Sequence, residues 1–139
     1  RKRAEFVEKA TAALRITNAA ALWGRAEDLA RDPRHREAYD VALARALAAL
    51  PVLSEYLLPF VRTGGAMLAW KGAAAEEELD AARDAIGALG GGSPAALPYA
   101  IPDEFCRLRI IVIDKILPSP PQYPRPAGKI AKKPLSLPD

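Results

Sequence analysis

The sequence has very little cysteine and histidine. Of its 139 residues, one is a cysteine, Cys106, and one is a histidine, His35. A single cysteine cannot form a disulfide within the chain, and these two residues cannot supply a zinc site. We therefore expect no metal ion and no internal disulfide, and a reducing compartment is compatible with this composition.

Long hydrophobic runs are also missing. None approaches the roughly 18 residues that a membrane-spanning helix needs. The basic residues at the start, 1–3, are not followed by the apolar segment of a signal peptide. Hydrophobic residues still make up 50% of the chain, which is enough for the core of one domain. The composition therefore predicts a soluble protein that does not contact a membrane.

The sequence does contain short apolar runs that alternate with segments of helical periodicity. Such alternation predicts an α/β sheet, with the last two strands forming a hairpin. The expected helical stripes begin at Phe6, Leu50 and Leu79, and the expected strands cover residues 18–23, 40–44, 66–70, 95–99 and 110–113. We expect one α/β domain over residues 1–117.

A charged residue directly follows one of these runs. Residues 41–44 are apolar and suit a strand that is covered on both faces, and Arg45 stands at its carboxyl end. In open α/β sheets, ligands bind beyond the carboxyl ends of the strands. Arg45 is therefore a candidate binding residue, and an ordinary ion pair at a strand end is the other interpretation.

The composition changes abruptly at Pro118. Residues 118–139 contain seven prolines, and their only acidic residue is Asp139. Proline at this density predicts an extended tail rather than a second domain. Its cations fit binding along a phosphate backbone, and a solvated, disordered end explains them equally well. These cations are Arg125, Lys129, Lys132 and Lys133.

Two other features have simple structural explanations. The charged stretch 31–37, which contains His35, predicts a solvated loop with an exposed histidine. The glycines at 90–92 follow a helix rather than a strand, so they predict a helix end and not a phosphate-binding loop.

An ordered series of short motifs covers nearly the whole chain. It comprises K-R-x-x-F from Lys2, G-R-A-E at 24–27, Y-D-V-A-L-A-R-A at 39–46, E-Y-x-L-P at 55–59, G-G at 64–65 with K-G at 71–72, P-x-P-x-x-Y-P-R-x-x-G at 118–128 and K-x-P-L at 132–135. This series resembles the ribosomal small-subunit RNA methyltransferase G family, also called glucose-inhibited division protein B. Ile130 departs from it, because the family usually has proline there.

The resemblance implies a fold and an activity. It implies the C-terminal part of a Rossmann-like class I methyltransferase, which methylates N7 of one guanine in 16S ribosomal RNA with S-adenosylmethionine. The glycine-rich cofactor loop and the ribose-binding acid would precede Arg1, so the fragment is expected to be inactive alone. Two missing strands would separate the segment 18–23 from 40–44, which therefore should not pair. The full-length protein is expected to be a monomer in the bacterial cytoplasm or, alternatively, the plastid stroma.

The resemblance also implies roles for individual residues. Ala26 and Glu27 match adenine-side positions, Arg45 matches a cofactor-site arginine, and Lys71 matches a lysine that we assign to RNA together with the tail cations. Glu27 and Arg45 are expected on the rim of one pocket. A further family arginine precedes the last strand, and Arg107 and Arg109 both compete for that position.

The expected chemistry needs no general base. Guanine N7 carries a free lone pair, so the reaction depends on holding nucleophile, methyl group and sulfur in line. Two alternatives remain open at this point. One is a non-catalytic RNA- or ribosome-binding α/β module, and the other is a small-molecule methyltransferase, which the basic tail disfavours.

Overall fold

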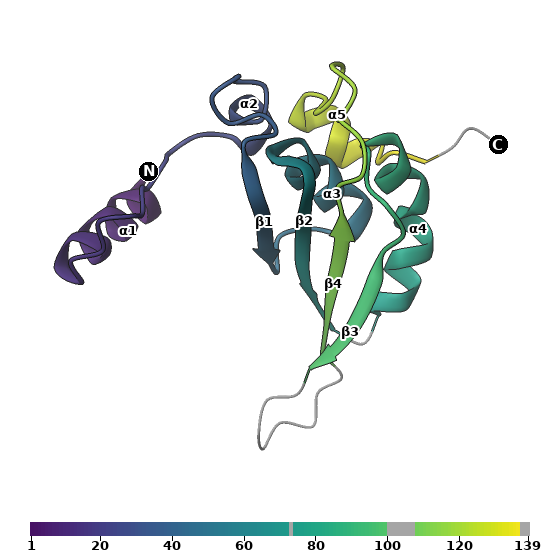
Figure 1. Ribbon diagram of the computed structural model, residues 1–139, viewed down its shortest axis with the longest axis horizontal. Helices are drawn as coiled ribbons and strands as arrows, with labels where there is room; N and C mark the ends of the chain where they lie inside the picture. Colours follow the sequence, from purple (N-terminus) through teal and green to yellow (C-terminus); the bar gives the residue numbers. More distant parts are fainter. Residues whose placement is uncertain (73, 100–107, 137–139) are drawn as a thin grey trace.

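The computed structural model describes residues 1–72, 74–99 and 108–136 (Figure 1). The strands are β1 (Tyr39–Arg45), β2 (Val61–Lys71), β3 (Ala95–Tyr99) and β4 (Leu108–Asp114). The helices are α1 (Lys2–Ala13), α2 (Ala26–Leu29), α3 (Leu50–Leu57), the 3-10 turn η1 (Leu58–Phe60), α4 (Ala75–Ala88) and α5 (Ala127–Lys132). The predicted alternation of strands and helices is confirmed.

The strands form one sheet in the order β1-β2-β4-β3. Strands β1 and β2 are parallel, and β4 is antiparallel to both β2 and β3. The predicted pairing of the last two strands is therefore confirmed. Because β1 and β2 run in the same direction, Arg45 and Trp70 are register partners where both strands end.

Helices α3 and α4 cover one face of the sheet (Figure 1). The core lies between them and the strands, and Leu53, Met67, Ile86 and Ile111 belong to it. Helix α3 begins with Pro51 in its first turn, where a missing N–H costs nothing. Helix α4 begins with three glutamates, which the positive end of its dipole stabilises.

Glycine ends helix α4 as predicted. Gly90 has φ +82°, a conformation that side chains with a Cβ rarely adopt. A Cβ at Gly90 would also lie 2.1 Å from the carbonyl oxygen of Leu117. The chain can therefore pass closely over the helix end only because glycine stands there.

Strand β1 is an exposed edge strand rather than the covered strand that the apolar run predicted. Alternate residues of a strand face opposite sides of the sheet, and the helices cover only one of these sides. Ala42 and Ala44 pack against the core, whereas Val41 and Leu43 are 49% and 61% exposed. Within the described residues, β2 is the only neighbour of β1. The prediction of burial on both faces was wrong for this reason.

The segment 18–23 is not a strand. These residues have no sheet partner in the described part of the chain, and a strand requires one. The expectation that they would not pair with β1 is met, but the predicted strand itself was wrong. The preceding helix is confirmed as α1, which stands apart from the sheet (Figure 1) and has no buried residue.

The proline-rich segment is packed against the domain and is not an extended tail. It contains helix α5, and Ile130 within this helix is fully buried. Tyr123 and Leu135 pack against the main core. Composition alone predicted an extended tail because proline lacks the backbone N–H that helices and sheets use. Composition gives no information on the distant residues that this segment packs against.

Some of these distant partners come from the stretch 31–37. Arg36 donates hydrogen bonds to the carbonyl oxygens of Ser119 and Tyr123, at 2.8 and 2.7 Å. Arg31 donates to the carbonyl oxygen of Pro124 at 2.9 Å. His35 stacks on Tyr39, and its Nδ1 lies 2.6 Å from the phenol oxygen. The stretch is therefore a docking site for the C-terminal segment rather than a solvated loop.

No helix in residues 1–72, 74–99 or 108–136 is long and apolar enough to span a membrane.

Candidate functional site

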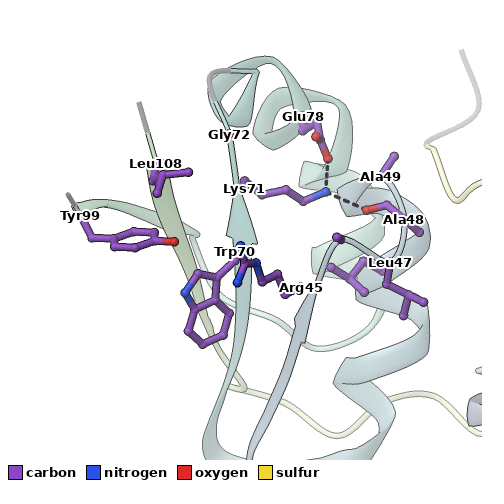
Figure 2. Close-up of a pocket in the computed structure, with 12 residues that line it drawn as sticks. Arg45, Leu47, Ala48, Ala49, Trp70, Lys71, Gly72, Glu78, Tyr99 and Leu108 are labelled. Carbon is purple, nitrogen blue, oxygen red and sulfur yellow. Dashed lines mark hydrogen bonds and ion pairs between the residues drawn. The ribbon is translucent and has the colours of Figure 1, made fainter. Parts of the chain in front are cut away.

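A pocket of about 520 Å³ lies at the carboxyl ends of β1 and β2 (Figure 2). Such ends are where open α/β sheets bind ligands, and this volume is within the range of small-molecule sites. The last residues of both strands, the loop 46–49 and parts of α3, α4, β3 and β4 line the pocket. Its side chains include Arg45, Leu47, Leu53, Trp70, Lys71, Glu78, Tyr99 and Leu108.

Arg45 supplies a positive charge at this pocket. It is the last residue of β1 and is exposed. No hydrogen bond or ion pair joins its guanidinium to the described residues, so the strand-end ion pair that sequence analysis left open is not formed with any of them. Ala46 follows in the left-handed region with φ +52°, so the chain turns sharply away from the strand end. The guanidinium is therefore available to an anionic ligand.

Lys71 is a structural residue rather than a free surface cation. Its Nζ donates hydrogen bonds to the Ala48 carbonyl at 2.7 Å and to Glu78 Oε2 at 2.6 Å, and its side chain is 10% exposed. The same Glu78 oxygen accepts the Leu50 N–H at 2.8 Å. Lys71 thus fixes the pocket wall at 46–49 against α4, and its expected contact with RNA phosphate does not fit this geometry.

Ala26 and Glu27 do not share the pocket with Arg45. They belong to α2, which lies beside the start of β1, whereas Arg45 stands at its other end (Figure 1). The Glu27 carboxylate is nearly buried and pairs with Arg25 at 3.3 Å. The expectation of a common rim was therefore wrong in this structure.

Burial, followed by the nearby charges of Glu27 and Glu55, raises the pKa of Tyr56. Tyr56 lies near the last turn of α3, away from the start of this helix, which borders the pocket. The acidic environment around Glu27 thus belongs to the packing of α2 on α3 and not to the pocket.

Arg125 is also structural. Its Nε and Nη2 donate to Glu55 at 2.9 and 2.7 Å, and its backbone N–H donates to the same carboxylate at 2.7 Å. The Glu55 side chain is fully buried, so Arg125 neutralises a charge inside the protein. The prediction that Arg125 contacts RNA does not fit this pairing. Lys129, Lys132 and Lys133 are exposed and remain candidates.

Of the two arginines that compete for the family position before the last strand, Arg109 is among the described residues. Arg109 lies in β4 opposite Lys71, and its Nη1 donates to the Leu108 carbonyl. Arg107 lies outside the described residues, as does Cys106. In the part of the chain that the structure describes, no group of His, Cys, Asp and Glu side chains is arranged to hold a metal ion.

Comparison with known proteins identifies the family. The pattern that defines the family "rRNA small subunit methyltransferase G" matches residues 1–97. The chain belongs to this methyltransferase G family. It is 45% identical over 134 residues to a "Ribosomal RNA small subunit methyltransferase G" of Moorella thermoacetica. Proteins of the same name from Leuconostoc citreum and Deinococcus radiodurans are 44% and 43% identical over 135 residues.

The chain spans about half the length of these methyltransferase G relatives. The matches cover 96–97% of the chain but only 53–56% of each relative. Family membership confirms the resemblance seen in the motifs, and the mixed α/β sheet agrees with part of a Rossmann-like methyltransferase.

Sequence analysis of this methyltransferase G chain missed some residues of the pocket. Trp70, Tyr99 and Glu78 line it, but each was treated only as part of a strand or helix. A signal for Trp70 did exist, because it directly precedes the Lys71–Gly72 motif at the end of the same strand. Tyr99 gave no such signal, since only the pairing of β3 with β4 brings it near the pocket.

Proposed function

We propose that this chain is part of an enzyme that methylates N7 of a guanine in small-subunit ribosomal RNA with S-adenosylmethionine. The named relatives support the reaction class. One feature of the chain itself carries the proposal: an arginine that pairs with none of the described residues, in a pocket at the carboxyl ends of parallel strands. We place the enzyme in the bacterial cytoplasm, with a plastid stroma as the alternative.

Arg45 is the residue we assign to the cofactor. Its planar guanidinium can donate paired hydrogen bonds to the carboxylate of the methionine part. The apolar side chains of Leu47 and Leu53 line the same pocket and suit the uncharged parts of the molecule. The donor and the apolar wall therefore fit S-adenosylmethionine, which when bound supplies a methyl group on a positively charged sulfur. The distance of α2 from this pocket argues against Ala26 and Glu27 as further contacts.

The chain's task in the reaction is orientation. Guanine N7 has a lone pair and no proton, so methyl transfer to it requires no proton acceptor among the side chains. The guanidinium must not donate paired hydrogen bonds to O6 and N7 of the target guanine, because the bond to N7 would occupy the lone pair that attacks the methyl group. Arg45 is therefore better suited to the cofactor carboxylate or an RNA phosphate than to the reacting base.

The exposed lysines of the C-terminal segment are our candidates for RNA phosphates. Lys129, Lys132 and Lys133 lie in or directly after α5, and neutralising phosphates with such residues makes binding depend on salt. Replacing all three with glutamine should weaken RNA binding and flatten its salt dependence. Arg125→Met, by contrast, should destabilise the folded chain rather than remove a contact with RNA.

The test uses a completed chain, in which residues 1–139 are joined to the part of the Moorella relative that the match leaves out. The measurement is transfer of labelled methyl groups to 16S ribosomal RNA, followed by digestion and detection of N7-methylguanosine. We expect transfer by the completed chain and strong loss in Arg45→Met. Arg62→Met is the matched control, because Arg62 is an exposed arginine paired with Asp40 at the other end of β1.

A non-catalytic RNA-binding module is the second candidate, favoured by the exposed lysines of α5. One experimental result distinguishes the enzyme from the RNA-binding module. A completed chain that is folded and binds the RNA, but neither binds the cofactor nor transfers methyl groups, would refute the enzyme and support the module.

A further inference from the structure

Trp70 lies next to Arg45 at the pocket mouth. Arg45 and Trp70 are direct partners in the parallel register of β1 and β2. The register continues from Trp70 to Ile110 in β4 and from there to Leu97 in β3. These residues share the face of the sheet opposite to α3 and α4, because Ala69 and Ile111 beside them are fully buried on the helix side.

Tyr99 adds a second aromatic ring on this face. It is two residues beyond Leu97 in β3 and lines the same pocket (Figure 2). Strand β4 lies between β2 and β3, so the backbones that carry Trp70 and Tyr99 are about 10 Å apart. Neither ring stacks on another ring among the described residues. Both side chains are partly exposed, and neither belongs to the hydrophobic core.

The proposed reaction requires a surface of this kind. Guanine N7 faces the major groove, which is deep and narrow in RNA helices, so the base must leave its stack to be methylated. An unstacked base loses its neighbours, and an aromatic side chain can replace them.

We propose that Trp70 is the platform on which an unpaired RNA base stacks, with Tyr99 at its side and Arg45 beside it. The inference rests on the proposed function and deepens it by naming where the substrate base binds. It assigns Trp70 and Tyr99 to the RNA rather than to the cofactor or the protein core. Stacking tolerates any base, so Trp70 provides affinity for an unpaired nucleotide and not the choice of guanine.

The first experiment follows the fluorescence of Trp70 in the 139-residue chain. The chain has two tryptophans, and Trp23→Phe leaves Trp70 as the single tryptophan. We expect a short single-stranded RNA that contains guanine to quench Trp70 saturably. A duplex of the same sequence should quench it much less. Equal quenching by the single strand and the duplex, or no quenching by either, would overturn the proposal.

The second experiment separates stacking from folding. Trp70→Leu should weaken binding of the single-stranded RNA about 5- to 150-fold, the usual range for one stacked base, and Trp70→Phe should recover most of it. Trp23→Leu is the matched control, because Trp23 is 72% exposed outside the pocket. If Trp70→Leu has the same thermal midpoint as the wild type and binds the RNA equally well, the proposal is wrong.

The completed chain distinguishes this inference from the proposed function. There, Trp70→Leu should raise KM for RNA and leave cofactor affinity unchanged. If the completed chain transfers no methyl groups while the RNA still quenches Trp70, the proposed function fails and the base platform stands. If transfer occurs with an unchanged KM in Trp70→Leu, only the platform fails.

Discussion

Replacing Arg125 with methionine should destabilise the protein strongly. The change keeps an unbranched, flexible side chain but removes the charge that Glu55 requires. The Glu55 side chain is fully buried, and Arg125 is 18% exposed. Nε and Nη2 of Arg125 both donate to this carboxylate, and Nη2 also donates to the Lys133 carbonyl. After the substitution, the backbone N–H of residue 125 is the only one of these donors that remains on Glu55.

The magnitude follows from the uncompensated charge. Removing one partner of a buried ion pair costs about 3–5 kcal/mol, which is a large share of the roughly 5–15 kcal/mol that stabilises a typical domain. The thermal midpoint should fall by about 10–20 °C. The assay is urea denaturation followed by circular dichroism, which gives the free energy of unfolding and its slope with denaturant.

Two variants serve as controls. Lys129→Met changes an exposed cation of the same segment and should alter stability by less than about 0.5 kcal/mol. The double variant Arg125→Met with Glu55→Met removes both charges and should recover most of the loss, because apolar replacements of a buried pair are often neutral. A loss below about 1 kcal/mol for Arg125→Met would refute the reasoning. An intact fold with weakened RNA binding would restore Arg125 to the RNA site.

Three further predictions concern other residues. Burial lowers the pKa of the Lys115 ammonium in the folded protein below 10.5, the ordinary value that it has in the unfolded chain. The unfolded chain therefore holds the Lys115 proton more tightly than the folded protein does. As a result, the free energy of unfolding rises with pH between the two pKa values. Urea titrations at several alkaline pH values should show this rise in the wild type and lack it in Lys115→Met. Gly90→Ala should lower the free energy of unfolding by about 1–3 kcal/mol, because Gly90 has a positive φ and lies against the Leu117 carbonyl. Gly87→Ala, with open space around its Cβ, should raise it by about 0.5–1 kcal/mol. Equal effects of the two substitutions in thermal denaturation would contradict this. Lys71→Met should cost about 1–3 kcal/mol by the same assay, and an unchanged stability would show that Lys71 does not fix the pocket wall.

Local patterns in the sequence predicted much of the fold. The strand at 95–99 and the helices that begin near Leu50 and Ala75 are where periodicity indicated. Gly64 and Gly65 precede the strand expected at 66–70, but they lie inside β2, where the β1–β2 register is irregular. A Cβ at Gly65 would lie 2.3 Å from the Asp40 carbonyl, so glycine here permits close strand pairing rather than a turn.

Contacts between distant residues were not predictable from the sequence. Arg125 and Glu55 are 70 positions apart, and Arg36 and Tyr123 are 87 apart. Composition therefore suggested a solvated loop and an extended tail, although the two segments bind each other. Arg45 was found because a charge at the end of an apolar strand is a local signal. Tyr99 was not found, because its position depends on sheet order.

The most direct test of the account is calorimetric titration of the completed chain with S-adenosylmethionine. A charge-assisted hydrogen bond contributes about 1.5–3 kcal/mol, so Arg45→Met should bind the cofactor about 10- to 150-fold more weakly than the wild type. Arg62→Met and Glu27→Gln should bind it as the wild type does, since neither residue lines the pocket. Unchanged affinity in Arg45→Met, or no binding by the folded wild type, would contradict the account.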